Sequence, residues 1–162
     1  MFGLDSGMVL HKIRDWLAAE GIAVREAHHK PTRTSEESAR ARGEEMKVGG
    51  KALVVKVDET FRLFVLSADR KLDSAAIKKH LAAKRTRFAT PEELMEMTGL
   101  VPGSIPPFGP PILPFPLNVD PSVFENDRVA FNAGSLTDSM VIPIEDYKRL
   151  VQADVFCFST PA

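Results

Sequence analysis

The sequence has a single cysteine, almost no net charge and no apolar run long enough to cross a bilayer. Because Cys157 stands alone, an internal disulfide framework is excluded. The 21 Lys and Arg residues nearly balance the 22 Asp and Glu residues, so any contact with nucleic acid has to be local. Residues 1–5 lack the basic start of a signal peptide. These absences favour a soluble cytoplasmic protein without a membrane partner.

Common catalytic motifs are also missing. The chain has no Gly-rich phosphate loop, dinucleotide fingerprint, zinc-protease motif or Gly-x-Ser-x-Gly nucleophile elbow. Its acidic residues are scattered over caps and surface positions, so no acid–base pair stands out. His28 and His29 are adjacent but have no further His or Cys at ligand spacing, which favours a hydrogen-bonding role. We therefore expect neither a metal nor a cofactor.

The length and the 44% hydrophobic content predict one domain, residues 1–162, of mixed α/β (α+β) class. Thr34 and Glu37 fit a capping box at a helix start. Residues 110–116 are expected to be an extended, proline-stiffened segment, and Cys157 to lie in the core. Apolar spacing predicts helices over 5–20, 34–42, 73–81, 90–98 and 143–151, and strands over 22–24, 51–57, 61–66, 84–88, 128–132, 139–142 and 154–158.

Two loops and one lysine are the candidate functional features. Residues 98–109 hold three glycines and three prolines, so they form a shaped loop in which Gly103 and Ser104 offer accessible backbone amides. A second small-residue loop spans 133–138. Lys51 follows two glycines at the start of a strand, where its ammonium can reach over a cleft. The alternatives are a rigid connector for the first loop and a solvated strand-end lysine for Lys51.

A dense basic run is the remaining feature. It comprises Lys78, Lys79, Lys84, Arg85 and Arg87. Phosphate binding is one explanation, and a solvated charged face is the other.

The order of these pieces resembles the YbaK/ProX family of aminoacyl-tRNA deacylases, which is related to the editing insertion domain of bacterial prolyl-tRNA synthetases. The matching segments are 34–39, 51–56, 68–73, 87–93, 98–109 and 133–135. This resemblance implies a mixed, mostly antiparallel, curved or barrel-like sheet with surrounding helices. Many relatives have a second glycine and a threonine where this chain has Ser104 and Ala52.

The resemblance implies hydrolysis of the ester between a wrongly attached small amino acid (Ala, Cys, Ser or Thr) and the terminal ribose of tRNA. It assigns the catalytic role to Lys51, Gly103 and Ser104. An ammonium and backbone amides suit this task because attack on an ester builds negative charge on the carbonyl oxygen. The substrate-binding residues that it implies are Thr34, Ile105, Pro106, Pro107, Phe108, Gly134 and Ser135.

The expected partner is the acceptor end of mischarged tRNA, which an aminoacyl-tRNA synthetase could deliver; DNA is not expected. Two other functions stay open from the sequence. The same cleft could bind a tRNA end or a synthetase without catalysis, or it could bind a small molecule. The oligomeric state is not indicated.

Overall fold

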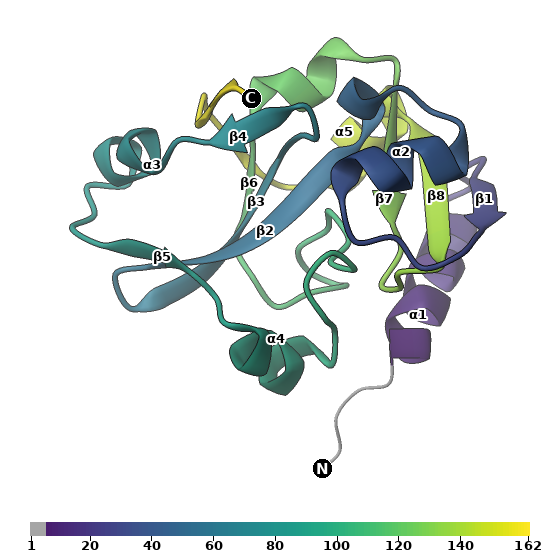
Figure 1. Cartoon of the computed structure of the whole chain (residues 1–162), viewed down its shortest axis with the longest axis horizontal. Helices are drawn as coiled ribbons and strands as arrows, with labels where there is room; N and C mark the ends of the chain where they lie inside the picture. Colours follow the sequence, from purple (N-terminus) through teal and green to yellow (C-terminus); the bar gives the residue numbers. More distant parts are fainter. Residues whose placement is uncertain (1–5) are drawn as a thin grey trace.

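The computed structural model describes residues 6–162, whose strands form three sheets. The largest is built on β2 (Gly50–Val57) and β3 (Thr60–Ser67), an antiparallel hairpin that crosses the middle of the molecule (Figure 1). This hairpin confirms the predicted pair of strands. The sheet continues with β5 (Thr86–Phe88), antiparallel to β2, and with β6 (Leu117–Val119) and β9 (Asp154–Val155), which run parallel to β3 and β6 in turn.

A second sheet holds the two strands that flank the loop at 133–138. Its order is β1 (Arg25–His28), β8 (Asp138–Pro143) and β7 (Arg128–Asn132), with antiparallel neighbours. A third, two-stranded sheet pairs β4 (Arg70–Leu72) with β10 (Ser159–Pro161). The combination of helices with mixed sheets confirms the expected mixed α/β fold. Within residues 6–162 the sheets are open, so they do not form a closed barrel.

The helices begin and end close to the predicted positions, because their caps are local in sequence. Thr34 and Thr90 each accept a bond from the backbone of the glutamate three residues later, and both capping boxes are complete. The helical elements are α1 (Ser6–Ala19), α2 (Ser35–Arg42), η1 (Met46–Val48), α3 (Ser74–His80), α4 (Pro91–Thr98), η2 (Pro121–Glu125) and α5 (Ile144–Leu150). Asp5, the predicted first residue of α1, lies outside the described residues. Residues 1–4, whose composition was considered above, lie outside them as well.

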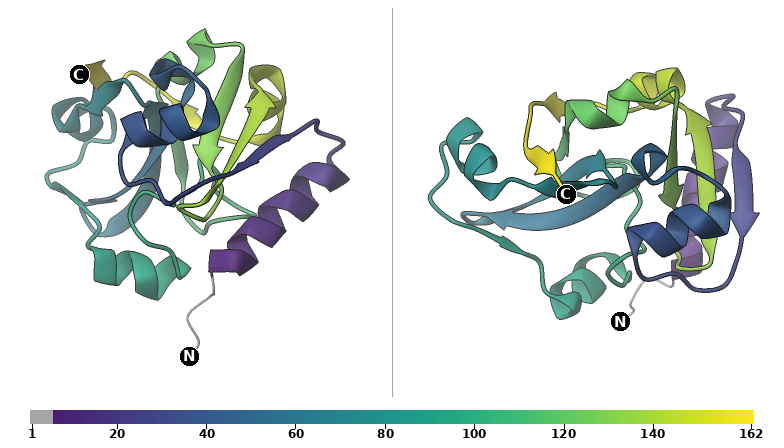
Figure 2. Two further views of the ribbon diagram at one scale, coloured as in Figure 1. Left: turned by 45° about the vertical axis from the view of Figure 1, so that its right-hand side comes forward. Right: turned by 45° about the horizontal axis from the view of Figure 1, so that its top comes forward.

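Two apolar clusters cover opposite faces of the β2–β3 hairpin. Val54, Leu63 and Val65 face the main core, which α1 joins through Val9, Ile13 and Leu17. Figure 2 shows α1 lying along one side of the β1–β8–β7 sheet. The other face of the hairpin packs Val55, Phe64 and Leu66 against Ile77 of α3 and Phe158. This alternation is what a strand covered on both faces requires.

The structure corrects four local predictions. The predicted strand 22–24 is not formed, since the N–H of Ile22 bonds the carbonyl of Leu17 and closes the turn that follows α1 at the left-handed Gly21, and the strand begins at Arg25. Residues 110–116 form turns, in which Ile112 and Leu113 bond back to Gly109, and β6 follows unpredicted. Of the predicted strand 154–158, only Asp154–Val155 forms a strand (β9); residues 156–158 are irregular, and β10 begins at Ser159.

The last correction concerns Cys157. Its side chain is exposed, and the neighbouring Phe158 is the buried residue. Among the helices of residues 6–162, none combines the length and the apolarity needed to cross a membrane.

Candidate active site

A cavity of about 250 Å³ opens between α2, the start of β2 and the loop at Gly103. It is lined by backbone-rich segments and by three cations, with no carboxylate or imidazole among its lining residues in the described chain. The lining residues are Arg33, Thr34, Ser35, Ser38, Ala39, Arg42, Met46, Gly49, Gly50, Lys51, Ala52, Leu53, Ala68, Gly103, Ile105 and Asn132. The cavity therefore unites Lys51, Gly103, Thr34 and Ile105 from the predicted set.

Lys51 is held at the edge of this cavity by its own strand. A Cβ at Gly50 would lie 2.8 Å from Cγ2 of Val129, so glycine lets the start of β2 approach β7 closely. The half-buried Lys51 ammonium donates a bond of 2.7 Å to the carbonyl of Arg70. Burial lowers the pKa of Lys51, and the nearby Asp69 opposes that shift. Two of the three ammonium protons stay available for a substrate oxygen.

The loop at Gly103 is shaped by left-handed backbone and by two external bonds. Gly103 has φ +88°, a conformation that favours glycine. Its carbonyl accepts 2.7 Å from Nδ2 of Asn132, and the carbonyl of Ser104 accepts 3.0 Å from the N–H of Gly134. One backbone hydrogen bond, from Gly134 to Ser104, therefore joins the two small-residue loops to each other.

The side chain of Ser104 is turned into its own loop and away from the cavity. Its side chain is buried, donates 2.7 Å to the carbonyl of Val101 and accepts 3.2 Å from the N–H of Val101. The hydroxyl thus closes the turn at 101–104 and is not among the groups that line the cavity. Ser104 shapes the loop, whereas Gly103 faces the cavity.

A buried guanidinium supports the Gly103 loop from the α2 side. Arg42 donates 2.9 Å to Oδ1 of Asn132 and 3.3 Å to the hydroxyl of Ser139. Burial lowers the pKa of Arg42 to about 10, with Glu44 opposing that shift, so the side chain stays charged at neutral pH. The Asn132 side chain therefore bridges the Arg42 guanidinium and the carbonyl of Gly103.

Residues 106–108 anchor the loop in the core and are not cavity-lining residues. Phe108 is fully buried and meets Trp16 and Phe131 edge-on, with ring centroids 5.2 and 5.1 Å apart. The carbonyl of Pro107 accepts 2.7 Å from the buried hydroxyl of Tyr147, and Pro106 is buried beside it. These residues fix where Ile105 and Gly103 can lie.

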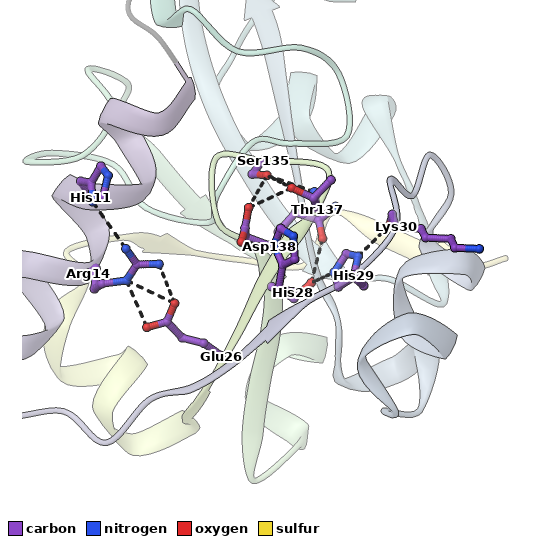
Figure 3. A network of polar contacts seen from close by, with 11 residues as sticks. His11, Arg14, Glu26, His28, His29, Lys30, Ser135, Thr137 and Asp138 are labelled. Carbon is purple, nitrogen blue, oxygen red and sulfur yellow. Dashed lines mark hydrogen bonds and ion pairs between the residues drawn. The ribbon is translucent and has the colours of Figure 1, made fainter.

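Gly134 and Ser135 likewise sit behind the cavity. Gly134 has φ +73°, and a Cβ there would lie 2.8 Å from Val9 in α1. Figure 3 shows Ser135 beside Thr137 and Asp138, and the Ser135 hydroxyl donates 2.7 Å to Oδ2 of Asp138. Burial raises the pKa of Asp138, but bonds from His28, Ser135 and Thr137 outweigh it and hold the pKa below its usual value.

The paired histidines have hydrogen-bonding partners. Nδ1 of His28 lies 2.9 Å from Oδ1 of Asp138, and Nε2 of His29 lies 2.8 Å from the hydroxyl of Ser139. In residues 6–162 no group of three or more His, Cys, Asp or Glu side chains is placed to hold a metal ion.

Arg33, Arg42 and Asn132 are among the cavity residues that no sequence motif indicated. Arg42 and Asn132 lie 90 positions apart, and only the packing of α2 against β7 brings them together. Arg33 precedes the capping box of α2, and its backbone N–H bonds Glu37. That position next to the N-cap was the one local signal that could have indicated it.

The chemistry available is electrostatic. Arg33, Arg42 and Lys51 give the cavity a positive field, and the glycines expose backbone, so the site can stabilise an oxyanion or bind a phosphate. The lining offers no general base, so a hydrolytic reaction here has to use water positioned by other groups.

Comparison with known families decides the matter: the profile of the aminoacyl-tRNA editing domain matches residues 29–150, which include every lining residue of the cavity. The chain belongs to the aminoacyl-tRNA editing domain family. It is thereby an aminoacyl-tRNA deacylase, an enzyme that hydrolyses mischarged tRNA. The family and the activity expected from the sequence are both confirmed.

The relatives agree with this assignment. The chain is 35% identical, over the full length of both proteins, to the Multifunctional Ser/Thr-tRNA deacylase ProXp-y of Escherichia coli strain K12. It is also 35% identical over 101 residues to the proline–tRNA ligase of Shouchella clausii, matching 62% of this chain and 18% of the ligase.

A solved structure of an editing-family fold supports the architecture. A proposed trans-editing enzyme for prolyl tRNA synthetase superposes with a TM-score of 0.81 at 25% identity, covering 94% of this chain and 97% of that one. The YbaK-like fold expected from the sequence is thereby confirmed.

Proposed function

We propose that this editing domain acts in trans, as one domain over residues 1–162, on tRNA charged with a small amino acid, above all serine or threonine. The single observation that carries the proposal is the full-length match to a Ser/Thr-tRNA deacylase. The cavity supports it, because about 250 Å³ suits a small acyl group and Ser35 and Ser38 supply hydroxyls to its wall. The substrate enters by its acceptor end, and a prolyl-tRNA synthetase is the proposed synthetase partner.

The proposed chemistry is attack of water on the ester carbonyl. A bond forms between the water oxygen and the carbonyl carbon, the bond from that carbon to the ribose oxygen breaks, and the proton of water ends on the ribose oxygen. The Lys51 ammonium stabilises the oxyanion, and the Gly103 backbone holds the acyl group against it. With no base in the cavity lining, a neighbouring ribose hydroxyl of the substrate orients the water.

Size exclusion is the proposed source of selectivity. A substrate that lacks one methylene is disfavoured by only about 1–3 kcal/mol, so a cavity discriminates weakly against side chains that are too small. A side chain that is too large clashes with the cavity wall and is rejected more strongly. Ile105 and Leu53 set its apolar limits.

A panel of mischarged tRNAs tests the proposal. Purified protein is mixed with tRNA carrying serine, threonine, alanine, cysteine or a large residue, and the loss of ester is measured against the spontaneous rate. We expect fast loss of the small residues and little loss of the large one. Ester loss no faster than the spontaneous rate for every tRNA, or binding without turnover, would contradict it.

A further inference from the structure

A second hollow lies at the end of β2 away from Lys51, around the turn of the β2–β3 hairpin. Figure 1 shows β5 running next to that turn. We call it the basic groove; its volume is about 430 Å³. It is lined by Lys56, Asp58, Glu59, Lys78, Lys84, Arg85, Thr86 and Arg87. Five cations thus face two carboxylates in a chain whose net charge is −1.

The two carboxylates leave most of these cations unpaired. Oδ1 of Asp58 accepts the backbone N–H groups of Lys84 and Arg85 at 3.0 and 2.9 Å. Glu59 is largely exposed and lies 3.9 Å from Lys56. Within residues 6–162, the side chains of Lys78, Lys84 and Arg85 make no ion pair, so they can bind an external anion.

The groove and the cavity lie toward opposite ends of β2. Lys51 and Lys56 are five residues apart on β2, which corresponds to about 17 Å along the strand, and this odd spacing places their side chains on opposite faces of the sheet. β5 runs beside this stretch with Arg87 opposite Lys56 and Phe88 opposite Val55. A few nucleotides of single-stranded RNA can span that separation.

An exposed aromatic ring lies beside β2 between the cavity and the basic groove. Phe88 is 58% exposed, whereas five of the nine phenylalanines within residues 6–162 are buried. Since Phe88 is paired with Val55, it lies on the face of the sheet that also carries Lys51 and Leu53, whereas Lys56 and Arg87 lie on the opposite face. A phenyl ring in this position can stack on a nucleobase without regard to its identity.

We propose that the basic groove binds tRNA phosphates next to the single-stranded 3′ end, and that Phe88 stacks on one base of that end. The proposal rests on the proposed function, because it requires an RNA whose acyl group occupies the cavity. Lys78, Lys84 and Arg85 neutralise phosphates, while the short distance along β2 sets how many nucleotides separate them from the ester. Local charge thus gives a nearly neutral protein its affinity for RNA.

The electrostatic part is tested by the double variant Lys84→Gln/Arg85→Gln. The dissociation constant of uncharged tRNA is measured from 50 to 200 mM salt, together with kcat/KM on mischarged tRNA and on a short aminoacylated 3′-end fragment. The slope of log Kd against log salt should fall by about 1.5, because two phosphate contacts are lost. The ratio of kcat/KM on tRNA to that on the fragment should fall about tenfold.

The matched control is Lys12→Gln/Lys148→Gln, which removes the same charge from α1 and α5, elements that line neither hollow. Its salt slope and kcat/KM ratio should equal those of the wild type. If Lys84→Gln/Arg85→Gln behaves like this control while the wild type deacylates tRNA, the groove proposal is overturned and the proposed function stands. If the wild type deacylates no tRNA, the proposed function fails first.

The stacking part is tested by Phe88→Ala, with Val155→Ala as the control at another exposed apolar position. Phe88→Ala should weaken tRNA binding between about 5- and 150-fold, the range of one lost base stack, without changing the salt slope. Val155→Ala should bind as the wild type does. Equal affinity of the two variants would overturn the role of Phe88.

Discussion

At the residue scale, the proposed chemistry depends on the charge of Lys51. Its ammonium is the cation that the Arg70 carbonyl holds at the cavity edge, and burial has already lowered its pKa. Lys51→Ala should reduce kcat/KM for mischarged tRNA by about 10²–10³-fold, as for the loss of one oxyanion donor. Lys51→Arg keeps the charge and should recover part of that loss. Rates are measured against spontaneous ester hydrolysis, with urea unfolding to verify that the variants fold.

The lowered pKa of Lys51 also predicts a pH dependence. The protonated form is the active one, so kcat/KM should fall as the pH rises through a pKa below the usual lysine value of about 10.4. The fall should be absent from the residual activity of Lys51→Ala. An alkaline limb that is identical in Lys51→Ala would show that another group titrates, and full activity of Lys51→Ala would remove the proposed role.

At the element scale, the loops at 98–109 and 133–138 support each other, because the N–H of Gly134 bonds the carbonyl of Ser104. Val9 of α1 packs closely against Gly134. Gly134→Ala adds a methyl group 2.8 Å from Val9 at a residue with φ +73°. We expect a loss of about 2–4 kcal/mol in the free energy of unfolding, from backbone strain and overpacking together. Urea unfolding measures it.

Gly21→Ala is the matched control for Gly134→Ala. Gly21 has φ +70°, but a Cβ there would meet no atom within 4 Å, so only the strain of about 1 kcal/mol applies. Equal losses for the two variants would contradict the close packing of α1 on the second loop.

How much the sequence could predict follows from how local each signal is. The α2 capping box needs only Thr34 and Glu37, and the β2–β3 hairpin needs only the apolar runs on either side of 58–60, so both were predicted. β6 was missed, because its partner β3 is distant in sequence and its centre, Asn118, is polar although buried. A buried asparagine gives no apolar pattern.

The candidate site divides in the same way. Lys51 and Gly103 could be identified from local glycine and strand signals and from the family resemblance, and the cavity contains both, although their catalytic roles stay predictions. Arg42 and Asn132 could not, since neither carries a local motif and their bond joins α2 to β7. Ser104 and Phe108 lie in the same loop as Gly103, and only the packing separates the residue that faces the cavity from those that hold the loop.

At the scale of the whole molecule, one buried carboxylate connects the chain's last strand to the site. Asp120 accepts the N–H groups of Ser122 and Phe158 at 3.0 and 2.7 Å, and the hydroxyl of Ser159 at 2.9 Å. Ser159 in turn accepts 2.6 Å from Nε of Arg70, whose carbonyl holds Lys51. Asp120 thereby stabilises the β4–β10 sheet on which the position of the ammonium depends.

Asp120 predicts how stability responds to acid. Burial alone would raise the pKa of Asp120, but the bonds from Ser122, Phe158 and Ser159 outweigh it and hold the pKa below its usual value. A depressed carboxyl pKa contributes stability that is complete above the unfolded pKa of about 3.9 and is lost as the pH falls through the folded pKa. Asp120→Asn should therefore lower the free energy of unfolding by about 1–3 kcal/mol at pH 7, and by less at pH 3. Urea unfolding at both pH values measures the difference.

The exposed Asp15 on α1 supplies the control, since Asp15→Asn removes the same charge without touching the Asp120 bonds. It should change the free energy of unfolding by less than about 0.5 kcal/mol at either pH. Because the bonds of Asp120 run through Ser159 and Arg70 to Lys51, Asp120→Asn should also lower kcat at neutral pH, where the protein is still folded. A variant that loses stability but keeps wild-type kcat would show that β4 holds Lys51 without help from the carboxylate.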